Sequence, residues 1–552
     1  MLLLPDILAR RAVDEPDRIA YIFLDDNGAE HTTTTYRELH EQAMAVAGLL
    51  RSRCEPGERA LLVFPQCVEF ITAYFGCLYA NIVAVPVNPP RRGKVQDATR
   101  SIVADCAPTA VLTIGGLVET LRPVLEPLCT ARQWLVVDEL STAETSFTPV
   151  TADPDSVAFL QYTSGSTSAP KGVMVTHRNL VANEEMIRHS FGHDRDSTVV
   201  GWAPFFHDQG LIGNVLQPVY VGATTVMMSP TTFIRRPLRW LEAISHYRAH
   251  TSGGPNFAFD ACVARAAAGE LPDLDLSSWK VAFNGAEPIR AQTLDRFAKT
   301  FAPLGFGAQA VFPCYGLAEA TLLVSASGKG RGPRLLDADI DALADRRYVA
   351  AGVDRGRTLV GSGVVLPGED LRIVDPATGE LCQEGRAGEI WVAGDHVAQG
   401  YWGLPEATTE TFHARRADDP ERTYLRTGDL GMVVDGELYV VGRLKDIIIL
   451  RGRNYYPHDI EHTVQRAHPA LRPGSGAAFA VPGRDGEKLV VVQEIKRDAD
   501  AGADDIAGVI RAAVMQEHEI AVADVVLAAP DTVQKTSSGK IMRAAARKRY
   551  LE

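Results

Sequence analysis

Tyr162-Thr-Ser-Gly-Ser-Thr-Ser-Ala-Pro-Lys-Gly172 carries the clearest structural signal in this chain. Its glycine, serine and threonine residues leave backbone N–H groups and hydroxyls available to hold phosphate oxygens. It is not a Walker P-loop, because that motif places glycine before its lysine, whereas proline precedes Lys171. The apolar runs 156–162 and 172–176 indicate two strands, so we expect a hairpin tip over a ligand.

A second polar loop with a lysine lies near the other end of the chain, in Lys535-Thr-Ser-Ser-Gly-Lys-Ile-Met-Arg543. Two such loops, far apart in sequence, predict an enzyme that closes over a nucleotide. A flexible surface segment is the plainer interpretation of a Gly/Ser stretch taken alone, but the order of the residues in 162–172 argues against it.

Length and composition bound the class of protein. With 552 residues the chain exceeds what one hydrophobic core serves, so we expect at least two domains. Lys+Arg 56 against Asp+Glu 69 gives a net charge of −13, which argues against affinity for nucleic acid or an anionic membrane. The eight cysteines lack any Cys-x-x-Cys or zinc-ligand spacing, so we expect free thiols in the cytoplasm.

Neither a leader nor a membrane anchor is expected. The N-terminus has three leucines before Pro5 and no basic flank, which does not fit a signal peptide. No apolar window reaches about eighteen residues, as a transmembrane helix requires. We therefore expect no integral membrane association.

Helix and strand patterns alternate through the first half of the chain. The capping box Thr35-Tyr-Arg-Glu38 opens a helix that runs to about Arg51, and the apolar run 59–64 follows as a buried strand. This alternation predicts a layered α/β architecture with parallel sheets. After about residue 360, short strands and turns predict a smaller β-rich subdomain.

Five motifs then occur in order along the chain. They are the loop 162–172, Cys314-Tyr-Gly-Leu-Ala-Glu319, Tyr424-Leu-Arg-Thr-Gly-Asp429, Gly442-Arg-Leu-Lys-Asp446 and Thr536-Ser-Ser-Gly-Lys-Ile541. Together they resemble the adenylate-forming superfamily of acyl-CoA synthetases, peptide-synthetase adenylation domains and luciferases. Four other segments resemble the fatty-acyl-AMP ligases, which load acyl chains onto carrier proteins: Phe205-Phe-His-Asp-Gln-Gly-Leu211, Gly253-Gly-Pro-Asn-Phe257, Phe283-Asn-Gly-Ala-Glu-Pro288 and Gly452-Arg-Asn-Tyr-Tyr-Pro457.

The resemblance implies the adenylate-forming enzyme fold. Residues 1–443 would form a large N-terminal AMP-binding domain of layered α/β subdomains plus the β-rich subdomain, and 447–552 a small mobile α+β domain. Residues 444–446 would form the hinge, with rotation at Lys445 carrying the second loop away after adenylation. The stretch 329–358 resembles an insertion of the fatty-acyl-AMP ligases, implied to limit C-terminal domain movement or access by coenzyme A; a neutral surface insertion is the alternative.

The chemistry requires a carboxylate to attack the α-phosphate of ATP, so the charge on two anions must be neutralised. The resemblance implies catalytic roles for Lys171, Glu319 and Lys540. Glu319 would also hold Mg²⁺, and Lys540 would bridge the carboxylate and the α-phosphate. The nucleotide-binding residues that it implies are Thr163, Ser164, Gly165, Ser166, Thr167, Asn284, Gly285, Ala286, Glu287, Tyr315, Gly316, Asp429 and Arg443.

A tunnel for the acyl chain is a weaker expectation. The candidate lining residues are Trp202, Phe206, His207, Asp208, Leu211, Ile212 and Phe257. An apolar stripe is more often ordinary core, and His207 fits a satisfied core histidine equally well.

Three functions remain open. The leading one is a fatty-acyl-AMP ligase that uses ATP and Mg²⁺, releases pyrophosphate and passes the acyl group to the phosphopantetheine thiol of an acyl carrier protein, in polyketide, nonribosomal-peptide or lipid biosynthesis. An acyl-CoA ligase that uses free coenzyme A is the alternative. A non-catalytic nucleotide-binding homologue is the third, and the presence of Lys540, Glu319 and Asp429 argues against it. The basic last helix would dock an acidic carrier protein, although a solvated helix end is the plainer interpretation.

Overall fold

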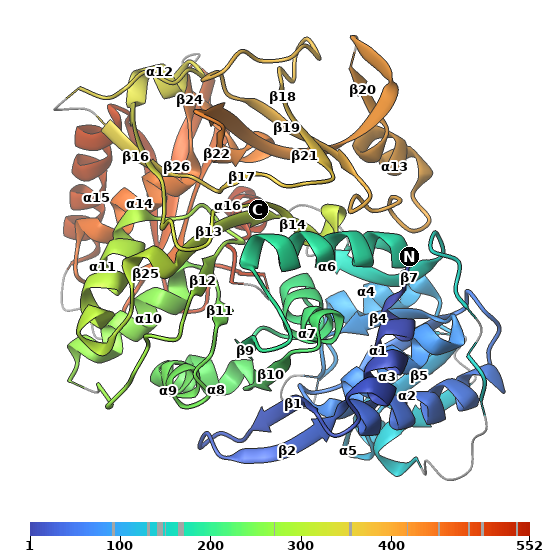
Figure 1. The fold of residues 1–552 in the computed structure, drawn as a ribbon. Helices are drawn as coiled ribbons and strands as arrows, with labels where there is room; N and C mark the ends of the chain where they lie inside the picture. The colour runs from blue at the N-terminus through green and yellow to red at the C-terminus, as the bar shows by residue number, and fades with distance from the viewer. Residues whose placement is uncertain are drawn as a thin grey trace.

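The computed structural model (Figure 1) describes most of the chain. The described residues are 1–90, 94–129, 133–140, 147–149, 151–163, 170–269, 271–352, 356–416, 418–450, 453–483, 486–497, 502–536 and 539–552. Within these ranges no helix is long and apolar enough to cross a membrane. All eight cysteines carry free thiols.

A six-stranded sheet holds the first polar loop. Its order is β6 (Gln133–Val136), β5 (Ala110–Thr113), β3 (Arg59–Val63), β4 (Val83–Val87), β7 (Val157–Thr163) and β8 (Lys171–Thr176). Neighbouring strands pair in parallel except β7 and β8, which pair antiparallel. The predicted hairpin is therefore confirmed. The helices of this part are α1 (Leu4–Asp14), α2 (Tyr36–Arg51), α3 (Val68–Ala80), α4 (Asp97–Cys106) and α5 (Gly115–Leu125).

The helix predicted from the capping box is confirmed as α2. The Thr35 hydroxyl accepts a hydrogen bond from the Glu38 backbone N–H, and the Glu38 carboxylate accepts one from the Thr35 N–H. These bonds satisfy donors that a helix start leaves without partners.

A nine-stranded mixed sheet forms the second layer. Its order is β17 (Val364–Val365), β14 (Leu323–Ala326), β13 (Val311–Gly316), β12 (Val281–Asn284), β11 (Thr251–Gly253), β9 (Thr198–Gly201), β10 (Thr224–Met227), β1 (Ile19–Leu24) and β2 (Glu30–Thr35). The stretch from β13 to β1 is parallel. Its helices are α6 (His177–Phe191), α7 (Gln217–Val221), α8 (Pro230–Arg235), α9 (Leu238–His246), α10 (Asn256–Ala267) and α11 (Ala291–Phe301).

The largest apolar cluster joins the two sheets. Leu62 and Phe159 of the first sheet belong to it together with Phe283 and Phe312 of the second. Helix α3 is apolar on nearly every side and is buried in this cluster, as such a helix must be. A second cluster, around Trp240, covers another face of the nine-stranded sheet. The predicted layered α/β architecture is confirmed.

The β-rich subdomain is also as predicted. Its sheet contains β18 (Glu369–Val374), β19 (Gly388–Gly394), β20 (Ala414–Arg416), β21 (Asp419–Val434) and β22 (Glu437–Arg443), with α13 (Pro405–Phe412) beside it. The segment 329–358 contributes a separate hairpin of β15 (Leu335–Asp339) and β16 (Gly356–Val360), with α12 (Ile340–Ala344) between them. Figure 1 shows α12 close to β24 (Arg453–Tyr455).

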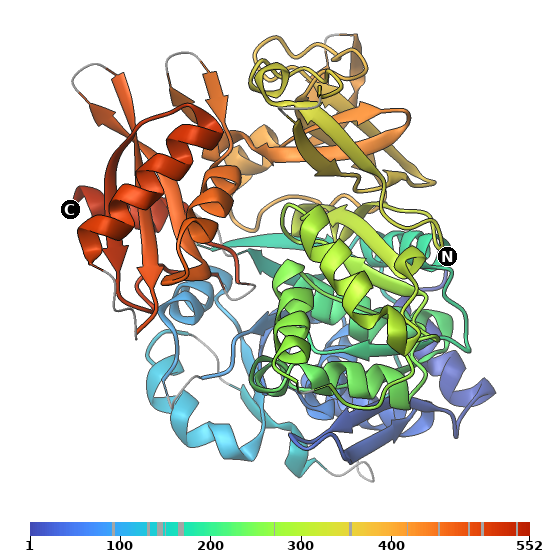
Figure 2. The same ribbon diagram turned by 90° about the vertical axis from the view of Figure 1, so that its left-hand side faces the viewer.

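The last hundred residues have a core of their own. The turn Leu444–Asp446 leads into β23 (Ile448–Leu450), β24, α14 (Pro457–Ala467), β25 (Leu471–Gly483), β26 (Gly486–Ile495), α15 (Ala503–His518), β27 (Val522–Ala528) and α16 (Arg543–Leu551). Their main apolar cluster contains only residues from Ile448 onward. Figure 2 shows these elements, in orange and red, to one side of the N-terminal part. This arrangement agrees with a boundary at 444–446, which stays a prediction.

Candidate active site

Lys171 and Glu319 are brought together by a tyrosine that the sequence did not single out. Lys171 pairs with Thr163 at the loop end of the β7–β8 hairpin, and residues 164–167 lie outside the described part of the chain. The Lys171 Nζ lies 4.5 Å from the centre of the Tyr401 ring, a cation–π contact. The Tyr401 hydroxyl donates a 2.9 Å hydrogen bond to Glu319 Oε1. One aromatic side chain thus links two predicted catalytic residues.

Hydrogen bonds hold the backbone at Glu319 in place. It lies in the short 3₁₀ turn Ala318–Ala320, and its carbonyl accepts a hydrogen bond from the Ala398 N–H. The next residue but one, Thr321, has a φ of +68°, and its hydroxyl donates to the His396 carbonyl. Burial, with the neighbouring Glu319 carboxylate, raises the pKa of Tyr401 far above its ordinary value. Tyr401 therefore remains a hydrogen-bond donor near neutral pH.

The Glu319 carboxylate suits a magnesium ion that is shared with phosphate. The described residues contain no group of three His, Cys, Asp or Glu side chains that could hold a metal alone. Mg²⁺ is usually bound by one or two carboxylates together with substrate phosphates and waters. Glu319 supplies one such carboxylate beside the hairpin, and the phosphates and waters would supply the other oxygen ligands.

A second group joins residues from three of the motifs. Asp429 on β21 and Arg443 on β22 are direct partners in the strand pairing. Arg443 Nε donates to Asp429 Oδ1 and the Tyr315 hydroxyl donates to Asp429 Oδ2, both at 2.9 Å. The Asp429 carboxylate raises the pKa of Arg443, and burial raises the pKa of Tyr315 far above its ordinary value. Both donors therefore keep their protons, and Asp429 is fixed between them.

The segment predicted to line adenine packs closely against β13. Asn284 is fully buried, and among the described residues its side-chain amide has no hydrogen-bond partner. A Cβ at Gly316 would lie 1.8 Å from the Leu322 carbonyl oxygen, so only glycine fits there. Ala286 has a φ of +72°. A buried amide without a partner calls for an explanation, and the predicted role of Asn284 in binding the nucleotide would supply one.

Glu287 connects this segment to the candidate acyl site. Its Oε1 accepts 2.9 Å hydrogen bonds from both the backbone N–H and the side-chain amide of Asn256, the first residue of α10. The Asn256 Oδ1 in turn accepts from the Arg290 N–H. Glu287 therefore fixes the start of the helix that carries Phe257.

The second polar loop lies against that same helix. The Thr536 N–H donates to the Lys540 carbonyl at 2.8 Å, and the Gly539 N–H donates to the Thr536 carbonyl at 2.9 Å, so the turn is closed on itself. A Cβ at Gly539 would come within 3.7 Å of the Phe257 ring. The loop that carries Lys540 is thus brought from the C-terminal domain to the N-terminal domain.

The candidate acyl residues divide into two sets. Trp202 stacks on Phe233 with ring centres 4.1 Å apart and meets Phe257 edge-on at 5.9 Å. Leu211 and Ile212 are fully buried in the core between the sheets, on the π-helix Gln209–Leu216. Such helices are frequent at functional sites. Phe257 lies near the Lys540 loop and Trp202 packs against Phe257, but the tunnel role of both sets stays a prediction.

The chain between these sets is held by polar contacts. The Phe206 carbonyl accepts a hydrogen bond from Gln161 Nε2, and the Phe206 and His207 rings lie 4.7 Å apart. Asp208 Oδ1 accepts from the Gln209 N–H at 2.7 Å and caps the π-helix. Asp208 therefore stabilises the start of the π-helix, which is a structural role.

The segment 329–358 contacts the C-terminal domain directly. Arg357 Nη1 lies 2.9 Å from Asp459 Oδ2, its Nη2 lies 2.7 Å from His458 Nε2, and its guanidinium stands 5.1 Å above the Tyr456 ring. The Asn454 side-chain amide donates to the Ala344 carbonyl at 2.8 Å. Burial raises the pKa of Asp459 to about 6, against the opposing effect of Arg357. These contacts cross the predicted hinge at Lys445, whose own pKa is lowered by burial.

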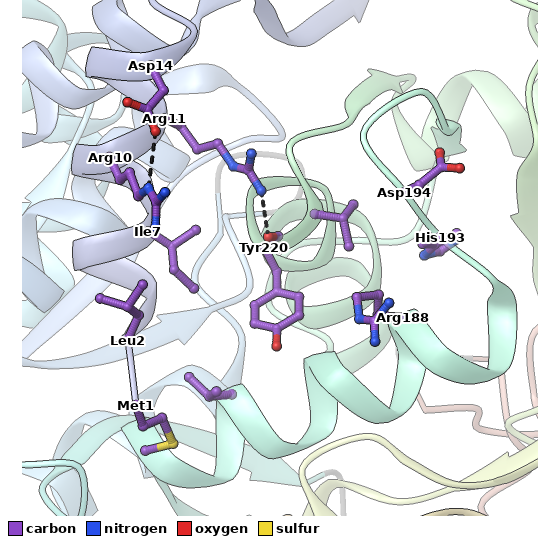
Figure 3. A pocket seen from close by; sticks show the side chains of 12 residues that line it. Met1, Leu2, Ile7, Arg10, Arg11, Asp14, Arg188, His193, Asp194 and Tyr220 are labelled. Carbon is purple, nitrogen blue, oxygen red and sulfur yellow. Dashed lines mark hydrogen bonds and ion pairs between the residues drawn. The ribbon is translucent and has the colours of Figure 1, made fainter.

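A separate cavity of about 640 Å³ lies beside α1, α6 and α7 (Figure 3). Its charged side chains are already engaged: Arg10 bonds to Asp14 at 3.1 Å, and Arg11 donates to the Tyr220 carbonyl at 3.1 Å. None of the predicted site residues is among those that line it. It is distinct from the site above.

Comparison with known proteins now decides the family. Residues 8–402 match the AMP-binding enzyme family. The chain belongs to that family. In this AMP-binding enzyme, residues 445–552 also match the Disco-interacting protein 2-like AMP domain.

The similar proteins within this family include several ligases that act on fatty acids. Medium-chain-fatty-acid–acyl-carrier-protein ligase JamA of Moorena producens (strain JHB) is 43% identical over 560 residues, which cover 99% of this chain and 95% of JamA. The fatty acyl-adenylate ligase of L. pneumophila, solved with acyl adenylate and pyrophosphate, has a TM-score of 0.79 and 39% identity over 100% of this chain and 96% of that one. A structure from a study of the E. coli and L. pneumophila fatty acyl-adenylate ligases has a TM-score of 0.90 and 32% identity, covering 100% and 98%. The fold and the resemblance of this AMP-binding enzyme to fatty-acyl-AMP ligases are confirmed.

Sequence reasoning missed Tyr401, Asn256 and Arg357. Gly400-Tyr-Trp402 has no charged side chain, and a lone tyrosine is more often part of the core, so its composition gives no signal of a site. Asn256 precedes Phe257 in the motif Gly253-Gly-Pro-Asn-Phe257, so its place in that motif could have marked it as a site residue. The partners of Arg357 are about a hundred residues away, which pattern reasoning does not reach.

Proposed function

We propose that this AMP-binding enzyme activates a medium-chain fatty acid with ATP and loads it onto an acyl carrier protein. In the first step a carboxylate oxygen attacks the α-phosphorus of ATP, the α–β phosphoanhydride bond breaks, and pyrophosphate leaves. In the second step the phosphopantetheine thiolate attacks the acyl carbon, and AMP leaves. The names of close relatives support the ligase chemistry and the chain length.

One structural observation carries the proposal. The Lys171–Tyr401–Glu319 group and the Tyr315–Asp429–Arg443 group are each pre-formed by tertiary contacts, while the Lys540 loop packs on Phe257. Cationic and hydrogen-bonding groups fixed before reaction stabilise charge in a transition state without reorganising. The arrangement suits a reaction that joins two anions.

The residues receive separate roles in this proposal. Lys171 and the loop 163–167 hold the outer phosphates, and Asn284, Gly285, Ala286, Glu287, Tyr315 and Gly316 line the adenine. Asp429 accepts hydrogen bonds from the ribose hydroxyls, and Arg443 holds Asp429 in place. Glu319 holds Mg²⁺, which when bound neutralises phosphate charge. Lys540 bridges the attacking carboxylate and the α-phosphate.

A carrier protein is the proposed acceptor, in preference to free coenzyme A. The contacts of Arg357 and Asn454 support this, because they tie the segment 329–358 to the C-terminal domain. A domain held in this way resists the rotation that admits a small free thiol. The free cysteines support a reducing compartment, so we also propose that the enzyme acts in the cytoplasm.

The experiment supplies ATP, Mg²⁺ and fatty acids of graded length, with a phosphopantetheinylated carrier protein or coenzyme A as acceptor. Mass spectrometry follows acyl-AMP, acyl-carrier protein and acyl-CoA. We expect acyl-AMP with every productive acid, acyl-carrier protein as the main product, and little acyl-CoA. Failure to form acyl-AMP from any acid would reject the adenylation proposal. Acyl-CoA formed as fast as acyl-carrier protein would instead identify an acyl-CoA ligase.

A further inference from the structure

Arg543 makes a set of contacts that a basic residue on a solvated helix does not make. It is the first residue of α16, and its Nε and Nη2 both donate to the Glu461 carboxylate at 2.7 Å. Its Nη1 donates to Asp446 Oδ2 at 3.0 Å. The exposed fractions of the three side chains are 23% for Arg543, 9% for Glu461 and 17% for Asp446. One guanidinium therefore neutralises two largely buried carboxylates.

The two carboxylates come from different places in the fold. Glu461 lies on α14, where its Oε1 also accepts a hydrogen bond from the Ala478 N–H of β25. Asp446 is the last residue of the hinge turn and follows Lys445 directly. Arg543 thus connects the hinge turn to the body of the C-terminal domain. A bidentate guanidinium fixes orientation as well as distance, which a single ammonium does not.

Two residues separate Arg543 from Lys540, and hydrogen bonds hold the turn on which both lie. The Met542 N–H donates to the Gln534 carbonyl at 2.9 Å, and the Lys540 N–H donates to the Thr536 hydroxyl at 3.0 Å. Lys535 and Ile541 form a β-bridge at the base of the same turn. A displacement of Arg543 therefore moves the turn that carries Lys540 as a unit.

We propose that Arg543 is the positioning residue for Lys540, because it fixes the Lys540 turn to the hinge through Asp446 and Glu461. This inference rests on the proposed role of Lys540 in adenylate formation. The position of Lys540 matters for joining the fatty acid to ATP, and not for the later attack of a thiol on the acyl carbon. The two half-reactions therefore respond differently when the Arg543 contacts are altered.

The test measures each half-reaction separately in the full chain. Asp446→Asn removes charge from the hinge contact and leaves the bidentate pair with Glu461, so the domain core keeps its main contact. Arg543→Lys keeps the charge and loses the bidentate geometry. Arg547→Ala is the matched control, since Arg547 lies on the same helix and, within the described part of the chain, donates only to the Ala480 carbonyl. Acyl-AMP formation is measured from ATP and fatty acid, and acyl transfer is measured from synthetic acyl-AMP to a phosphopantetheinylated carrier protein.

We expect kcat for acyl-AMP formation to fall about 100-fold in Asp446→Asn and Arg543→Lys, since a misplacement of about 1 Å costs roughly that factor. The KM for ATP, acyl transfer to the carrier protein and the thermal midpoint should stay near those of the wild type, and Arg547→Ala should form acyl-AMP at the wild-type rate. Wild-type acyl-AMP formation in both variants would overturn the positioning role alone. An equal loss of both half-reactions would show a purely structural role and overturn it as well. If the wild type forms no acyl-AMP, the proposed function fails and this inference fails with it.

Discussion

Tyr401 and Glu319, 82 residues apart in sequence, are joined by a 2.9 Å hydrogen bond from the tyrosine hydroxyl. The same tyrosine presents its ring to Lys171. The carboxylate proposed to hold the metal and the lysine proposed to hold phosphate are thus oriented by one side chain. Groups that orient a metal ligand usually matter almost as much as the ligand itself.

The variant Tyr401→Phe removes the hydroxyl and keeps the ring beside Lys171. We expect acyl-AMP formation to fall about 10-fold to 100-fold, with a higher Mg²⁺ concentration needed for half-maximal rate. Pyrophosphate exchange into ATP, measured over a Mg²⁺ series, checks this. Tyr424→Phe is the control, because it removes a similar 2.9 Å bond to Asp370 in the β-rich subdomain. An unchanged Mg²⁺ dependence in Tyr401→Phe would refute the orienting role.

Asp429→Asn removes the charge that pairs with Arg443. A hydrogen bond to a charged group contributes about 1.5–3 kcal/mol, so we expect the KM for ATP to rise roughly 10-fold to 100-fold. Stability should change by less than about 1 kcal/mol, since the Arg443 side chain is 41% exposed. Steady-state kinetics and thermal unfolding measure the two effects. Asp418→Asn, which removes the charge of an exposed carboxylate that pairs with the buried Arg416, should leave KM unchanged; a similar rise there would point to general disturbance of the sheet.

Lys540→Ala should abolish acyl-AMP formation and leave ATP binding largely intact, because the other nucleotide contacts belong to the N-terminal domain. Product analysis and equilibrium binding of ATP measure the two properties. The matched control is Lys548→Ala, at an exposed position of α16. Acyl-AMP formed at the wild-type rate by Lys540→Ala would contradict the assigned role.

Arg357→Gln should loosen the C-terminal domain, because it breaks the pair with Asp459 and the contact with His458. Each 1.4 kcal/mol of lost contact shifts an equilibrium tenfold, so we expect acyl-CoA formation with free coenzyme A to rise by about that factor or more. Competition between coenzyme A and a carrier protein measures it. Arg347→Gln lies in the same segment and, among the described residues, breaks only a local pair with Asp345, so it should behave as the wild type. An unaltered product ratio in Arg357→Gln would show that the segment does not control the acceptor.

The buried His177, which directly follows the β7–β8 hairpin, should make the stability of the fold sensitive to acid. Burial lowers the pKa of this histidine from 6.5 to about 4, partly offset by Asp6. Because the folded state holds it neutral, its contribution to stability is complete above about pH 6.5 and is lost as pH falls through about 4. His177→Gln should reduce the fall in unfolding free energy over that window by up to roughly 3 kcal/mol. Denaturant titrations at several pH values measure it, with exposed His413→Gln as control; parallel curves for wild type and His177→Gln would exclude the effect.

Local signals in the sequence predict much of this fold. The capping box at Thr35 gives α2, and the apolar runs around the loop 162–172 give the β7–β8 hairpin. These elements depend on contacts between near neighbours, which local sequence determines. The motifs also name every residue of the Tyr315–Asp429–Arg443 group, and they name Lys171 and Glu319 but not the Tyr401 that joins them.

The way those residues meet could not be predicted. The pairing of Asp429 with Arg443 depends on the register of β21 and β22, which includes a bulge between Leu430 and Gly431. Tyr401 reaches Glu319 only because the chain crosses from the nine-stranded sheet to the β-rich subdomain and back. Such contacts depend on three-dimensional packing and leave no periodic signal in the sequence.

The double hydrogen bond from Asn256 to Glu287 has a practical meaning for redesign. These bonds join the segment proposed to line the adenine to the helix proposed to face the fatty chain, so a displacement of one should also move the other. Substitutions at the N-terminal end of α10 that accommodate a bulkier acid should therefore also alter the affinity for ATP. Selection for a new acid in this scaffold must screen both substrates together.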